Sequence, residues 1–73
     1  MSLFDPSALF ESALRSHQIG DLSRAAEGYE AALKINGDFA PALHYLGLIV
    51  YQRGDASRAV ALIEKALKLA PSL

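Results

Sequence analysis

The chain repeats itself with a period of 34 residues, and this period constrains the fold more than any other feature. Sliding the sequence against itself by 34 residues aligns thirteen identical residues without a gap. Gly20–Asp21 falls on Gly54–Asp55, and Ser23–Ala25 falls on Ser57–Ala59. A fixed period of this length is typical of arrays in which each unit is one small supersecondary structure. We therefore expect one domain over residues 1–73, built from unit one (6–39) and unit two (40–73).

Each unit predicts two helices joined by a tight turn. Asp5 suits an N-cap, and Pro6 suits the first helical position, where a missing N–H removes no hydrogen bond. Phe4 and Leu9 are spaced for a hydrophobic staple across that cap. Gly20 tolerates the positive φ of a helix C-terminal turn, so the first helix should end there.

The same turn signals recur along the rest of the chain. Asp21 is placed to cap the second helix, Gly37–Asp38 should break the chain, and Gly54–Asp55 should form the next turn. Pro71 should prevent further helix. The sequence thus predicts four antiparallel helices and an all-α fold class.

Composition narrows the function classes. With a formal net charge of −1, the chain gives no electrostatic reason to bind nucleic acid or an acidic membrane. It has no cysteine, so nothing indicates an oxidising compartment, and we expect a cytoplasmic protein. The longest apolar run, Leu46–Tyr51, is too short to span a bilayer. Hydrophobic residues make up 52% of a small domain, so some apolar surface should stay exposed or meet a partner.

The residues that could carry catalysis are few. Ser16, His17 and Asp21 resemble a hydrolytic triad only by proximity, because no strained turn presents the serine as a nucleophile. We interpret them as capping and solvated residues. His17 and His44 are the only histidines, and no carboxylate pattern around them completes a metal site. We expect no enzyme activity, no cofactor and no metal.

The pattern of small and large residues resembles that of the tetratricopeptide repeat family, over Pro6 to Leu73. In unit two the matching residues are Leu43, Leu46, Gly47, Val50, Gly54, Ala59, Ile63, Ala66 and Pro71. Unit one keeps Leu9, Ala13, Gly20, Ala25, Tyr29 and Ala32, and it departs from the pattern at Ser12, Ser16 and Gly37. The resemblance implies two tandem helix-turn-helix repeats that form a short right-handed α-solenoid.

Small residues at three paired positions should let the two helices of each unit approach closely. These pairs are Ala13/Gly47, Ala25/Ala59 and Ala32/Ala66. We expect Tyr29 and Ile63 to fill the space between the helices.

In this family the first helix of each unit lines a concave groove. Carried over by position, the resemblance implies a partner-binding groove made of Phe10, Leu14, His17, Gln18, His44, Leu48, Tyr51 and Gln52. Phe10, His44 and Tyr51 should be its anchors, because they fall opposite the core stripe and aromatic anchors dominate interface energetics. The alternative is that Met1 to Phe4, or water, fills the groove.

Two functions are consistent with this resemblance. The first is a protein–protein interaction module that binds a peptide or protein partner through the groove. The second is a structural role, as the first repeats of a longer array or a segment of a multidomain enzyme, with no activity of its own.

The second helix of unit two should present an apolar surface. A solenoid buries the second helix of each unit beneath the next unit, so Ala26, Leu33 and Ile35 should lie beneath unit two. The equivalent residues at the end of the chain are Val60, Leu67 and Leu69. We expect them to form a self-association face, either in a homodimer or in packing onto a further repeat.

Overall fold

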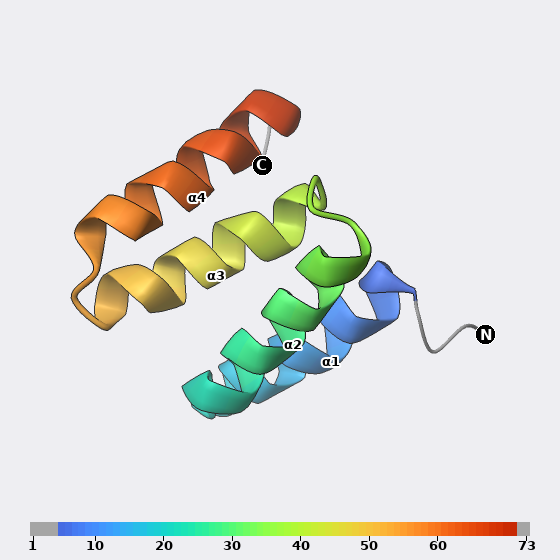
Figure 1. The fold of residues 1–73 in the computed structure, drawn as a ribbon. Coiled ribbons are helices and arrows are strands. Elements are labelled where there is room, and N and C mark those ends of the chain that lie inside the picture. The colour runs from blue at the N-terminus through green and yellow to red at the C-terminus, as the bar shows by residue number, and fades with distance from the viewer. Residues whose placement is uncertain (1–4, 72–73) are drawn as a thin grey trace.

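The computed structural model describes residues 5–71, which fold into four α-helices joined by short turns (Figure 1). The helices are α1 (Pro6–Gln18), α2 (Leu22–Ile35), α3 (Ala40–Gln52) and α4 (Ala56–Leu69). Helices α1 and α2 form one hairpin and α3 and α4 form the other, with α2 packed against α3. The predicted all-α fold of two tandem helical hairpins is confirmed.

Aspartate side chains cap three of the helices. The Asp5 carboxylate accepts a hydrogen bond from the Ser7 N–H at 2.9 Å, which caps α1. The carboxylates of Asp21 and Asp55 accept from the backbone N–H groups three residues further on, at 3.2 Å and 3.1 Å. An N-cap of this kind stabilises a helix by about 1 kcal/mol. Helix α3 begins after Phe39 with no side-chain cap.

Glycine ends α1 and α3 in the same way. Gly20 has φ +86° and Gly54 has φ +94°, a region of backbone space that side chains with a Cβ rarely adopt. After α1, the Asp21 N–H donates to the Ser16 carbonyl at 2.9 Å and the Gly20 N–H donates to the His17 carbonyl at 3.0 Å. This pair of bonds is a Schellman motif, so the turns predicted at both glycines are confirmed.

Close approach of the helices within each hairpin depends on small residues. In unit two, a Cβ added to Gly47 would lie 2.6 Å from Ile63 Cγ1. In unit one, a Cβ added to Gly28 would lie 2.6 Å from the Ala13 Cβ. Gly28 is a helix contact that the repeat pattern does not predict, since unit two has Leu62 at the equivalent position.

One core spans the junction of the two hairpins. Its largest fully buried side chains are Tyr29 on α2 and Ile49 on α3. All the small residues predicted at helix contacts are buried, namely Ala13, Ala25, Ala32, Gly47, Ala59 and Ala66. The prediction that Tyr29 fills the space between helices is confirmed, because none of its surface is exposed.

Two sequence expectations involve residues that the structure does not describe. The proposed staple uses Phe4, and the alternative filling of the groove uses Met1 to Phe4, all outside the described residues.

The prediction that Ile35 packs beneath unit two is wrong, since its side chain is 43% exposed while Ala26 is buried and Leu33 packs against the core. Ile35 lies nine residues after Ala26, about two and a half helical turns, so it points to the opposite side of α2.

Candidate binding site

Aromatic rings from both hairpins meet where α1, α2 and α3 come together. The central ring is that of Tyr29, which stacks on the Tyr45 ring at a centroid distance of 5.9 Å and an interplanar angle of 27°. Phe10 on α1 packs against both, at 5.7 Å from Tyr29 and 5.6 Å from Tyr45. Phe39, just before α3, meets the Phe10 ring edge-on at 5.8 Å. These four residues together with His17 are called the junction cluster below.

His17 completes the junction cluster from α1. Its Nδ1 lies 3.0 Å from the Tyr29 hydroxyl oxygen, and its ring packs edge-on against Tyr45 at 5.9 Å. Burial, together with the neighbouring Tyr45, raises the pKa of Tyr29 from 10.0 to about 12. The hydroxyl of Tyr29 is therefore neutral at physiological pH, and His17 satisfies its hydrogen bonding within the fold.

His44 lies at the edge of this cluster. Its ring meets the Tyr45 ring at 5.3 Å and 90°, and its Nδ1 is buried with no hydrogen-bond partner among the described residues. Buried polar groups usually make a hydrogen bond, so this nitrogen of His44 is an exception. The side chain as a whole is only partly buried.

The exposed part of the predicted groove lies mainly on α3. Tyr51 is 64% exposed and Leu48 is 38% exposed. Gln18 and Gln52 are also exposed, and Leu14 is partly buried. We call the predicted groove residues the α1–α3 face, namely Phe10, Leu14, His17, Gln18, His44, Leu48, Tyr51 and Gln52. None of them is an Asp, Glu, Lys or Arg, so the face has no carboxylate, ammonium or guanidinium group of its own.

The structure corrects one expectation about this face. Phe10 was expected to lie opposite the core stripe, and this is wrong, because Phe10 packs against the core through Tyr29 and Tyr45. His17 is held in the same way by the Tyr29 hydroxyl. Of the three predicted anchors, Tyr51 alone is largely free of the core.

Sequence reasoning missed the part of Tyr45 in joining the two units. Tyr45 is the equivalent of Glu11 in unit one, so the repeat comparison by itself marks this position as polar. The available signal was the presence of aromatic residues in three successive helices, at Phe10, Tyr29 and Tyr45. Only their contact in space shows that they form one cluster.

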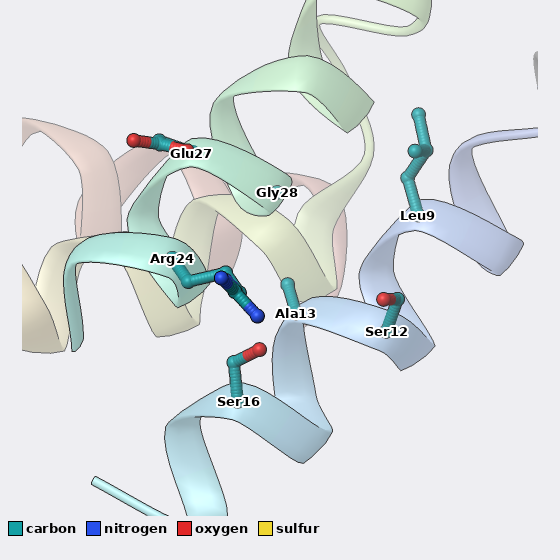
Figure 2. Close-up of a pocket in the computed structure, with 7 residues that line it drawn as sticks. All are labelled: Leu9, Ser12, Ala13, Ser16, Arg24, Glu27 and Gly28. Carbon is teal, nitrogen blue, oxygen red and sulfur yellow. The ribbon is translucent and has the colours of Figure 1, made fainter. Parts of the chain in front are cut away.

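Unit one has a hollow of about 270 Å³ between α1 and α2 (Figure 2). The residues that line it are Leu9, Ser12, Ala13, Ser16, Arg24, Glu27 and Gly28. At three of these positions, Ser12, Ser16 and Gly28, unit two has the larger residues Leu46, Val50 and Leu62. Leu46 and Val50 are buried, whereas Ser12 is exposed and Ser16 is only partly buried.

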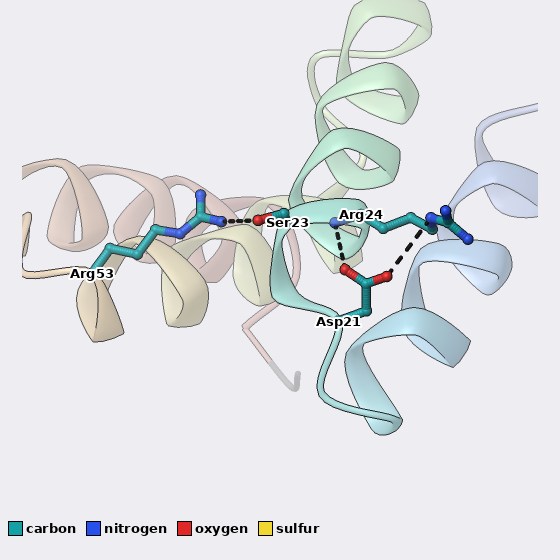
Figure 3. A network of polar contacts seen from close by, with 4 residues as sticks. All are labelled: Asp21, Ser23, Arg24 and Arg53. Carbon is teal, nitrogen blue, oxygen red and sulfur yellow. Dashed lines mark hydrogen bonds and ion pairs between the residues drawn. The ribbon is translucent and has the colours of Figure 1, made fainter.

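Exposed polar contacts surround the turn between α1 and α2 (Figure 3). The Asp21 carboxylate that caps α2 also lies 3.7 Å from Arg24 Nε. Arg53, at the end of α3, donates to the Ser23 hydroxyl at 3.3 Å and so links unit two to the start of α2. Such solvent-exposed contacts contribute little to stability.

Residues 5–71 contain neither a metal-ligating cluster nor a membrane-spanning helix. No group of His, Cys, Asp or Glu residues in that range could hold a metal ion. None of the four helices described is both long enough and apolar enough to cross a membrane.

Comparison with known proteins bears on unit two. A family model described as tetratricopeptide repeat matches residues 40–73, which contain α3 and α4. No curated protein matches the chain.

Proposed function

Because the chain belongs, through residues 40–73, to the tetratricopeptide repeat family, we propose that it binds a peptide or protein partner on its α1–α3 face. Repeats of this family generally mediate protein–protein interactions and are not catalytic. The family supports the general role, and the surface of α3 supports the location.

The exposed side chains of α3 carry the proposal. Tyr51 and Leu48 are large and apolar, yet they stand out from the fold at 64% and 38% exposure. They lie three residues apart on one helix and so share a face. Exposed aromatic residues of this kind are the usual anchors of interfaces.

The lack of charge on this face indicates the chemistry of the partner. A partner carboxylate or ammonium group buried here would lose its hydration and find no opposite charge on the α1–α3 face. An apolar or aromatic segment would instead gain from burial against Leu48 and Tyr51. The proposed partner is therefore a peptide segment rich in uncharged apolar and aromatic residues.

The junction cluster supports the face from beneath. Phe10 and His17 are held by Tyr29 and Tyr45, so their positions do not depend on a partner. A preorganised surface loses less conformational freedom on binding than a mobile one. Phe10 and His17 are thus positioned to form the fixed wall of the site.

A test uses peptides selected from a displayed random library on the wild-type chain. The variant Leu48→Ala, Tyr51→Ala removes two exposed side chains and should keep the helical circular dichroism. Selected peptides should bind it at least about tenfold more weakly, the size expected for the loss of an interface anchor.

The matched control is Ile19→Ala, Ile35→Ala. These side chains are also exposed, at 82% and 43%, but lie outside the α1–α3 face. They should leave peptide binding unchanged. If the selected peptides bind the Leu48→Ala, Tyr51→Ala variant as tightly as the wild type, the α1–α3 face is not the site.

A structural role within a longer array is the second candidate, and the exposed apolar residues of α4 favour it. Val60 and Leu67 are 53% and 45% exposed on the helix that a following unit would cover. This role predicts that the α1–α3 face selects no peptide above background. A predicted cytoplasmic location is consistent with either candidate.

A further inference from the structure

The two histidines of the α1–α3 face are held in different ways. The Nδ1 of His17 lies 3.0 Å from the Tyr29 hydroxyl oxygen, so its hydrogen bonding is satisfied within the fold. The Nδ1 of His44 is buried and has no partner among the described residues. Leaving a buried polar atom without a hydrogen bond costs stability. The fold by itself therefore gives no reason for a histidine at position 44.

Unit one shows that this position of the repeat needs no polar atom. The residue equivalent to His44 is Phe10. Both rings pack against Tyr45, with centroid distances of 5.6 Å for Phe10 and 5.3 Å for His44. An apolar ring thus makes the same kind of contact without an unmatched nitrogen. A local feature that costs stability with no structural gain is expected at a functional site.

His44 lies on the part of α3 that carries the proposed binding site. His44, Leu48 and Tyr51 are spaced four and three residues apart, so they share one side of the helix. Within residues 5–71, His44 Nδ1 is the one side-chain nitrogen or oxygen that is buried without a partner. The Nε2 of the same ring makes no hydrogen bond to a described residue either, so it must reach the surface of this partly buried side chain.

The burial of Nδ1 favours one tautomer of the neutral ring. In a neutral imidazole one nitrogen donates a hydrogen bond and the other accepts one. A proton on Nδ1 of His44 would bury an N–H group with no acceptor, and such groups are rare in proteins. We therefore expect the proton on Nε2, which places a hydrogen-bond donor at the surface of the α1–α3 face.

We infer that the Nε2–H of His44 donates a hydrogen bond to a main-chain carbonyl of the partner, and that the partner lies on the α1–α3 face as an extended segment. This hydrogen bond presupposes the proposed function, because it forms only with a partner on that face. An extended segment has carbonyl groups free to accept, whereas inside a helix each carbonyl already accepts from the N–H four residues further on. A carboxylate acceptor is disfavoured, because the face has no ammonium or guanidinium group to replace its lost hydration.

Nitrogen-15 NMR of the imidazole rings in the free chain tests the tautomer without any partner. At a pH where the ring is neutral, the signals of His44 should show the proton on Nε2. A proton on Nδ1 overturns the inference, whatever the chain binds.

The variant His44→Phe tests the hydrogen bond. It removes both nitrogens and keeps an aromatic ring of the kind that unit one accommodates at Phe10. It should unfold at a urea concentration no lower than that of the wild type, because no buried nitrogen is left unmatched. The peptides selected from the displayed library should bind it about threefold to tenfold more weakly, the loss expected for one hydrogen bond.

Two further variants are matched to this one. His17→Phe makes the same change at the other histidine and should lower the urea midpoint, because the buried Tyr29 hydroxyl loses its partner. His44→Gln keeps an N–H donor and should bind the peptides more tightly than His44→Phe does. An equal loss of stability in His17→Phe and His44→Phe overturns the inference, since His44 would then be satisfied within the fold.

Ester linkages in a selected peptide locate the acceptor, because an ester carbonyl accepts a hydrogen bond more weakly than an amide carbonyl. At one position the ester should weaken binding to the wild type and change binding to His44→Phe much less, which shows that the two groups are coupled. Coupling of His44 to a side-chain carboxylate or amide of the peptide, or a peptide bound as a helix, overturns the inference.

The two proposals for this face fail in different ways. Peptides that bind Leu48→Ala, Tyr51→Ala more weakly than the wild type but bind His44→Phe equally well overturn the hydrogen bond and leave the proposed function intact. Peptides that bind Leu48→Ala, Tyr51→Ala as tightly as the wild type overturn both.

Discussion

Unit one and unit two share the aspartate caps of their second helices and the glycine turns, but they differ in where they place large side chains. Unit one has Tyr29 at its centre and a hollow beside Ser12 and Ser16. Unit two has Ile63 at the position of Tyr29 and buries Leu46 and Val50 at the positions of the two serines.

The difference follows from the neighbours of each unit. Leu46 and Ile49 of α3 are buried beside α2, whereas the equivalent Ser12 and Arg15 of α1 are exposed. On α4 the larger residue is the exposed one. Val60 is larger than its equivalent Ala26 on α2, and Val60 is exposed whereas Ala26 is buried. The sequence of each repeat therefore depends on what lies beside its helices as well as on the fold of the repeat itself.

The largest expected effect on stability comes from Tyr29. Its hydroxyl has no counterpart in unit two, where Ile63 stands at the equivalent position. Its pKa is raised from 10.0 to about 12 in the folded state, so the neutral form is the one that the fold stabilises. This contribution is complete below about pH 10 and is lost as the pH rises through about 12. A two-unit shift corresponds to about 2–3 kcal/mol of the free energy of unfolding.

Denaturant unfolding of wild type and Tyr29→Phe across this range measures the effect. The free energy of unfolding of the wild type should fall relative to that of Tyr29→Phe between about pH 10 and 12. Tyr51→Phe removes an exposed hydroxyl and should keep the wild-type profile. Parallel curves for wild type and Tyr29→Phe would contradict the assignment of Tyr29 as the alkali-sensitive group.

The next effect on stability concerns a helix contact that occurs at the same position in each hairpin. Ala25 and Ala59 are equivalent and almost wholly buried, at 0% and 1% exposure. Ala25→Leu and Ala59→Leu should each overpack the contact within a hairpin and destabilise the fold by about 1–3 kcal/mol. Ala61, exposed on α4, should accept lysine within about ±0.5 kcal/mol.

Thermal unfolding of Ala25→Leu, Ala59→Leu and Ala61→Lys measures these changes in stability. Equal shifts for Ala59→Leu and Ala61→Lys would show that the side of α4 packed on α3 is misassigned. A large difference between Ala25→Leu and Ala59→Leu would show that the two hairpins are not packed alike.

The smallest effect concerns the hollow of unit one. Ser12→Leu with Ser16→Val would give unit one the kind of residues that unit two buries at these positions. Filling the hollow should raise stability by about 0.5–2 kcal/mol, the usual gain from filling a cavity.

Ser57→Leu, at an exposed serine that does not line the hollow, is the control and should change stability by no more than about 0.5 kcal/mol. Urea unfolding measures both changes. If the filled variant is no more stable than this control, the hollow in unit one is not equivalent to the filled space of unit two.

Local features of the sequence determined most of the fold. The 34-residue period, the capping aspartates and the glycines at positive φ place the helices and their turns. The caps and turns act within a few residues, through hydrogen bonds and backbone geometry, so they can be predicted without knowing which helices lie nearby. The small residues at helix contacts follow from the same pattern, as Ala59 and Gly47 show.

The tertiary structure alone decided which side of each helix is covered. The helical period places Leu33 and Ile35 on different sides of α2, but only the position of α3 shows that Leu33 packs and Ile35 does not. The meeting of Phe10, Tyr29 and Tyr45 likewise depends on how three helices cross. The helical period sets the direction in which a side chain points from the axis of its helix. Whether that side chain is buried depends on where a second helix crosses the first. This crossing is set by packing between residues far apart in the sequence.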